Sequence, residues 1–158
     1  SDSVLSRMNR RYTSQEYREA VNTIRRTFPY AAITTDVIVG FPEETDQEFE
    51  QTYEFLKELK LYETHIFKYS PRNGTKAAEM PDQVDPSVKN SRSECLIKLN
   101  AKNKKDFEDL HVGQIVDILI ETHENGYATG HTKNYIKAGI KTQENLSNQI
   151  IKSRITDI

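Results

Sequence analysis

The chain has 158 residues, a net charge of −2 and a single cysteine, Cys95. No apolar run approaches the roughly 20 residues that a membrane-spanning helix needs, and no signal peptide is visible, so we expect a soluble cytoplasmic protein. One cysteine excludes both an intrachain disulfide and an iron–sulfur cluster with three or four thiolate ligands, so we expect no metal site in this chain. The pI of about 6.1 argues mildly against a purely electrostatic nucleic-acid binder, although a local basic face remains compatible with it.

Helical and strand signals alternate over the first half of the chain. Thr13 and Glu16 form a capping box before an apolar stripe at helical spacing, which should end before Pro29. The segment 33–39, with its apolar run Val37, Ile38 and Val39, predicts a strand buried on both faces, and Gly40 ends it.

The same pattern then repeats once. A second capping box at residues 45–48 opens another helix, and residues 64–69 predict a second short strand. Strands that alternate with helices over short connections are typical of parallel βαβ units. Two strands do not make a stable sheet by themselves, so we expect the sheet partners to lie outside this chain, which would then be a fragment.

The second half of the chain combines a long helix with short strands. Asp85 and Pro86 mark the helix start, and we expect the helix to end near Leu110. The predicted strands are 114–120, 127–131, 135–138 and 150–158, and the turn of a hairpin is expected at residues 125–126. Such short strands with glycine turns suggest a small β-barrel, so we place a domain boundary near His111, between 1–111 and 112–158.

Three segments resemble the motifs of the radical S-adenosylmethionine methylthiotransferases. They are residues 7–13, residues 35–45 and the loop 69–78, which stand in the order of that family and at about its spacing. The resemblance covers nearly the whole chain. Residues 65–69 are most similar to the branch that modifies N6-threonylcarbamoyladenosine in tRNA. The isopentenyladenosine branch and the ribosomal-protein branch are the alternatives.

The resemblance implies an α/β fold: the C-terminal portion of a parallel (β/α) barrel, then a long helix and a small antiparallel β-barrel that is OB-like and called TRAM. It also implies S-adenosylmethionine and two 4Fe-4S clusters as cofactors, with the cluster ligands upstream of Ser1 and absent from this chain. The implied partner is tRNA, without a membrane. We expect a monomer, and we expect the chain by itself to be catalytically incomplete.

The resemblance also implies a cofactor site where the two predicted strands end. Ligands of parallel α/β folds bind outside the carboxyl ends of strands. The candidate cofactor-binding residues are Ile38, Val39, Gly40, Phe67, Tyr69 and Ser70. Alternatively, Ile38 and Val39 are plain core residues and Gly40 only turns the chain. No catalytic residue is assigned.

Two acidic residues follow Gly40. The family usually has glycine where this chain has Glu43, so we expect either the loop conformation or its ligand contact to differ here. A positive φ costs a residue with a side chain roughly 1 kcal/mol or more. Glu44 matches the family, and its simplest role is that of an acid favoured by a helix N-terminus.

Cations and an aromatic residue cluster in the predicted barrel, a mixture that suits stacking on bases and contact with the backbone of single-stranded RNA. The candidate RNA-binding residues are His131, Lys133, Asn134, Tyr135 and Lys137 in the barrel, together with Arg72, which lies in an earlier loop bounded by proline and glycine. Two other functions stay open: a non-catalytic RNA-binding module, and a generic α/β domain whose loops resemble the family by chance.

Overall fold

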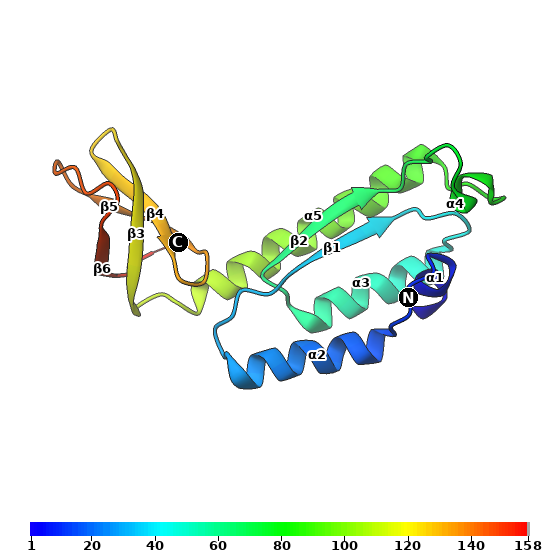
Figure 1. Ribbon diagram of the computed structural model, residues 1–158, viewed down its shortest axis with the longest axis horizontal. Helices are drawn as coiled ribbons and strands as arrows, with labels where there is room; N and C mark the ends of the chain where they lie inside the picture. Colours follow the sequence, from blue (N-terminus) through cyan, green and yellow to red (C-terminus); the bar gives the residue numbers. More distant parts are fainter. Residues whose placement is uncertain (158) are drawn as a thin grey trace. The chain divides into compact units, whose positions relative to one another are not determined.

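The computed structural model describes residues 1–157. The chain divides into two compact units, Ser1–Lys104 and Lys105–Ile158. Within the described residues, no helix is both long enough and apolar enough to cross a membrane. The fold mixes helices and strands, and its second half is a curled antiparallel sheet (Figure 1).

The first unit contains a parallel pair of strands flanked by helices. The strands are β1 (Thr34–Val39) and β2 (Glu63–Lys68), which pair in parallel as the alternating pattern predicts. The helices are α1 (Asp2–Arg7), α2 (Ser14–Thr27), α3 (Asp46–Leu59), α4 (Lys76–Glu79) and α5 (Pro86–Asp109), of which α5 continues into the second unit. The sequence did not predict the short helices α1 and α4.

Both predicted capping boxes are confirmed. The backbone N–H of Glu16 donates to Thr13 Oγ1 at 3.2 Å, and the N–H of Thr13 donates back to Glu16 Oε2 at 2.8 Å. Thr45 and Glu48 repeat this reciprocal pair at the start of α3, with distances of 3.2 and 2.9 Å. Each box satisfies two backbone donors that a helix start leaves without a partner, which fixes where α2 and α3 begin.

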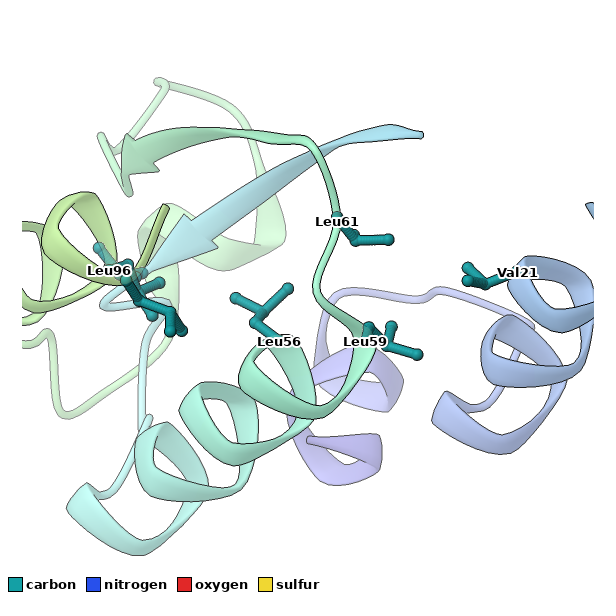
Figure 2. Packing of buried hydrophobic residues seen from close by; sticks show 7 residues of the cluster. Val21, Leu56, Leu59, Leu61 and Leu96 are labelled. Carbon is teal, nitrogen blue, oxygen red and sulfur yellow. The ribbon is translucent and has the colours of Figure 1, made fainter. Parts of the chain in front are cut away.

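The core of the first unit lies against one face of the sheet. Helices α2, α3 and α5 supply Val21, Leu56, Leu59 and Leu96, which pack with Leu61 (Figure 2). The sequence-based prediction that the first strand is buried on both faces is wrong.

The opposite face of the sheet carries Asp36 and its register partner His65, and both are exposed. The three core helices pack against Val37, Val39 and Ile66 on the other face. Burial of this strand is therefore one-sided within the described part of the chain.

The second unit is a four-stranded antiparallel sheet in the order β5-β4-β3-β6. Its strands are β3 (Ile115–Glu124), β4 (Tyr127–Thr132), β5 (Lys137–Lys141) and β6 (Ile150–Arg154). Ile118, Ile120 and Ala128 form its core. The hairpin turn predicted at residues 125–126 is confirmed, because Asn125 and Gly126 both have positive φ, as a type I′ turn requires.

Three strands of the second unit differ in their bounds from the sequence-based prediction. The strand predicted at 114–120 continues to Glu124. The strand predicted at 135–138 begins only at Lys137, because Tyr135 has a φ of +65° and lies in a turn. The strand predicted at 150–158 ends at Arg154, and residue 158 lies outside the described residues.

Candidate functional site

The carboxyl ends of β1 and β2 lie side by side and form the first candidate site. The backbone N–H of Tyr69, just past β2, donates to the carbonyl of Val39 at 2.9 Å. The rings of Phe41 and Tyr69 then meet edge to face at 5.2 Å. This is the edge at which parallel α/β folds bind ligands.

Gly40 follows β1 with a φ of +69°. A Cβ atom at this position would collide with Cγ of Lys89, whose side chain reaches over the loop from α5. The Lys89 ammonium donates to the carbonyl of Tyr69 at 3.1 Å and lies 5.3 Å from the centre of its ring. The close approach that a glycine permits is thus made by a lysine of this chain.

Glu44 is buried beneath the same loop. Its side chain is 2% exposed and its Oε2 accepts the backbone N–H of Gly40 at 2.6 Å. Arg92, whose side chain is 6% exposed, donates to that oxygen at 2.8 Å and to the Glu44 carbonyl at 3.0 Å. A second guanidinium nitrogen binds Asp46 at 2.8 Å.

Burial raises the pKa of Glu44, while the Gly40 N–H and the charge of Arg92 act in the opposite direction. The sequence suggested only that Glu44 is an acid at a helix N-terminus. In the structure, the Glu44 carboxylate stabilises the loop from within, because it accepts hydrogen bonds from Gly40 and Arg92.

Glu43 has a φ of +64°, in the left-handed region that glycine adopts without steric penalty. The backbone N–H of Glu43 donates to the carbonyl of Asp82 at 3.0 Å, and Arg7 donates to the carbonyl of Glu43 at 3.3 Å. These two bonds hold the loop in a conformation that costs a residue with a side chain roughly 1 kcal/mol or more. The departure at position 43 therefore leaves backbone strain in the loop.

The six predicted cofactor-binding residues differ in whether they are still open to a ligand or are already buried or bonded within the protein. The Val39 side chain is fully buried, and the Val39 carbonyl and the Gly40 N–H are already bonded within the protein. Ile38 and Phe67 are register partners on the open face of the sheet and line a cavity of about 240 Å³. Ser70 is exposed and Tyr69 is half-buried. The groups open to a ligand are therefore Ile38, Phe67 and Ser70.

The same cavity is lined mainly by apolar side chains of α1, β1 and α3, among them Val4, Val37 and Phe55. Cys95 is half-buried. No cluster of histidine, cysteine or acidic residues within 1–157 has the composition to hold a metal ion. The residues of this chain therefore do not fit a 4Fe-4S cluster, which needs several thiolates.

The second candidate site lies on the outer face of the antiparallel sheet. Strand register places Ile150, Leu119, His131 and Lys137 in one row across all four strands. Leu119 is 47% and Ile150 is 70% exposed, which is high for large aliphatic side chains. Sequence reasoning missed these two residues, although the alternation of apolar and polar residues along β3 points Leu119 away from the core.

Two predicted RNA-binding residues of the second unit, His131 and Lys137, belong to this row. Tyr135 is 75% exposed, and its ring lies 5.8 Å from that of His131. Lys133 is exposed and forms an ion pair with Asp117 at 3.1 Å. His131 Nδ1 lies 2.9 Å from Glu121 Oε2, and the half-buried side chain of Asn134 is bonded to Thr132 and His111. Arg72 is exposed in a loop of the first unit.

Comparisons with known proteins agree with the sequence motifs. The model of the radical SAM superfamily matches residues 1–56. The threonylcarbamoyladenosine tRNA methylthiotransferase of Bacillus subtilis is 41% identical over 98% of this chain. The tRNA-2-methylthio-N(6)-dimethylallyladenosine synthases of Pelotomaculum thermopropionicum and Aquifex aeolicus are 42% and 35% identical over 77% and 98% of it.

The chain spans 36%, 27% and 35% of the lengths of these three relatives.

Proposed function

We propose that this chain, which belongs to the radical S-adenosylmethionine methylthiotransferase family, is part of an enzyme that adds a methylthio group to N6-threonylcarbamoyladenosine in tRNA. The observation that supports this substrate best is the similarity to the Bacillus subtilis enzyme, which extends over nearly the whole chain. Several dimethylallyladenosine synthases are similar over the same length, so isopentenyladenosine is the alternative substrate. A ribosomal protein is the third.

In this proposal the first unit holds the cofactor. Residues 1–111 would be the C-terminal portion of a parallel (β/α) barrel, with β1 and β2 as two of its strands. Ile38 and Phe67 present apolar surface beside the cavity, and Ser70 offers a hydroxyl at the strand end. Val39, Gly40 and Tyr69 shape this edge, because their bonds join the two strand ends to each other and to α5.

S-adenosylmethionine, when bound, supplies the radical and methyl-transfer chemistry. The side chains of this chain contribute binding and orientation of the cofactor, and their apolar surface excludes water. The 4Fe-4S clusters that the family implies would need ligands outside the described residues.

The second unit, in the same proposal, binds tRNA. Residues 112–158 would form a TRAM-like, OB-like barrel whose outer face meets the RNA. Lys133 and Lys137 offer positive charge to phosphates, while Tyr135 and His131 offer rings on which bases stack. Arg72 would add a cation from the first unit.

The substrate is tested by expressing the full-length gene in bacteria that lack methylthio-modified tRNA. Nucleosides from digested tRNA are then analysed by mass spectrometry. We expect the methylthio derivative of N6-threonylcarbamoyladenosine to appear, and no modification of isopentenyladenosine. The reverse result would transfer the assignment to the other tRNA branch, and a methylthio group found only on a ribosomal protein would refute tRNA as the substrate.

A non-catalytic RNA-binding module is the second candidate, and the outer row of the sheet supports it independently of any chemistry. Titration of the protein with a tRNA transcript at two salt concentrations tests this role. Affinity should fall as salt rises, because neutralised phosphates release their counterions. Binding without nucleoside modification by the full-length protein would favour this candidate.

A further inference from the structure

We propose that His111 is a positioning residue, which holds the turn at residues 132–136 so that Tyr135 is presented to RNA; this rests on the RNA-binding role proposed above. His111 is 2% exposed and follows the end of α5 in the second unit. The sequence treated it only as a domain boundary. One ring nitrogen contacts the backbone of α5, and the other contacts Asn134, which is part of the turn.

The partners of His111 determine which ring nitrogen holds the proton. Nε2 lies 2.8 Å from the side-chain nitrogen of Asn134, which can only donate, so Nε2 is the acceptor. Nδ1 lies 3.0 Å from the carbonyl of Phe107, which can only accept, so Nδ1 has the proton. The ring therefore joins the end of α5 to the turn.

The bonds continue beyond Asn134. The hydroxyl of Thr132 donates to Asn134 Oδ1 at 2.7 Å, and the backbone N–H of Ile136 donates to that same hydroxyl oxygen at 3.1 Å. The side chains of Thr132, Asn134 and His111 each donate one bond and accept another, so each bond orients the next. The series thus runs from His111 through Asn134 and Thr132 to Ile136, so it bonds the residues on both sides of Tyr135.

Tyr135 needs such support because its backbone is strained. Its φ is +65°, which is uncommon for a residue with a bulky side chain and costs roughly 1 kcal/mol or more. The Tyr135 N–H donates to the carbonyl of Thr132 at 3.0 Å, and Thr132 and Ile136 close the turn with a backbone bond of 2.9 Å. Strain of this kind persists only where the surroundings fix the conformation, and it often marks a functional site.

The result of this strain is the orientation of one exposed ring. Tyr135 is 75% exposed and its ring lies beside that of His131, which belongs to the row that includes Leu119 and Lys137. An aromatic ring held in a fixed position loses less conformational entropy when a base stacks on it. His111 would thus increase RNA affinity without touching RNA.

Two amide substitutions separate the roles of the two ring nitrogens. In His111→Gln, the amide oxygen can occupy the place of Nε2 and still accept from Asn134. In His111→Asn, the shorter amide can occupy the place of Nδ1 and still donate to the Phe107 carbonyl. Both variants lose one buried hydrogen bond and part of the ring, so their losses of stability should be similar.

The assay measures the dissociation constant for a fluorescently labelled anticodon stem-loop RNA, using the whole protein. We expect His111→Gln to bind within about twofold of the unchanged protein. His111→Asn should bind roughly fivefold more weakly or worse, which is the lower end of what one stacked base contributes. Thr132→Val breaks the series at a second point and should match His111→Asn.

His123→Gln is the control, because His123 is a histidine of the same unit whose ring nitrogen lies 3.0 Å from a different carbonyl, that of Thr142. It should leave the dissociation constant unchanged.

Amide hydrogen exchange of Tyr135 gives a readout that does not depend on RNA. Exchange should be faster in His111→Asn than in His111→Gln at equal global stability. Equal exchange and equal affinity in the two variants would overturn the positioning role. Absence of RNA binding by the unchanged protein would instead refute the proposed function, and the exchange experiment would still decide the role of His111.

Discussion

Arg92→Met tests the buried ion pair beneath the Gly40 loop. The Arg92 and Glu44 side chains are 6% and 2% exposed, so solvent does not screen them. The substitution removes the cation but leaves the carboxylate buried, where it still accepts the Gly40 N–H. Removing one partner of a buried pair costs about 3–5 kcal/mol, so we expect the free energy of unfolding to fall by about that amount.

The measurement is urea denaturation followed by circular dichroism, at pH 7. Glu44→Gln keeps an acceptor for the Gly40 N–H and should cost less than Arg92→Met. The double variant should lose less than the sum of the two single losses, with a coupling of about 1–3 kcal/mol for residues in contact. Glu58→Gln is the matched control, because it removes an exposed carboxylate from an ion pair with Arg18 and should leave the denaturation midpoint nearly unchanged.

Two results would refute this reasoning. The first is a loss for Arg92→Met as small as that for Glu58→Gln, which would mean that the pair is not buried in solution. The second is strict additivity of Glu44→Gln and Arg92→Met, which would mean that the two side chains do not interact.

Three further predictions concern pH, the glycine loop and the RNA surface. A hydrogen bond from Arg7 lowers the pKa of Glu48 from 4.5 to about 2. Its carboxylate should therefore stabilise the fold by up to about 3 kcal/mol above pH 4.5, and lose that contribution as the pH falls toward 2. Glu48→Gln should lower the denaturation midpoint at pH 7 and have little effect near pH 2; an equal effect at both would count against the assignment. Gly40→Ala should destabilise by at least about 1–2 kcal/mol, from its φ of +69° and the collision with Lys89, and Lys89→Ala should relieve only the collision. Full stability of Gly40→Ala would contradict this. Lys137→Ala should weaken tRNA binding and reduce the slope of log affinity against log salt by about one, and an unchanged slope would remove Lys137 from the RNA surface.

Local signals in the sequence were sufficient for much of the fold. The two capping boxes, the Asn125–Gly126 turn and the alternation of helix and strand each depend on residues close together in the chain, and each appears in the structure. Strand ends were less predictable. Tyr135 continues a strand-like pattern, but its φ of +65° belongs to a turn held by bonds to Thr132 and Ile136.

The candidate sites divide in the same way. Sequence motifs predicted a site where β1 and β2 end, and register places Ile38 beside Phe67 on the open face of the sheet. They did not indicate that Val39 and Gly40 already have partners within the protein. The exposed row that includes Leu119 and Ile150 requires the pairing of β3 with β6, which no local pattern specifies.

The sequence by itself determined the family, the order of the elements and the strand end at which the cofactor is proposed to bind. Only the tertiary structure showed that a buried ion pair of Glu44 and Arg92 stabilises the loop after that strand. The two residues are 48 positions apart, and each alone resembles a solvated surface charge. The hydrogen bond between His111 and Asn134, which are 23 positions apart, was likewise visible only in the tertiary structure. A buried polar side chain depends on the partner that satisfies it, and folding brings that partner from a distant part of the chain.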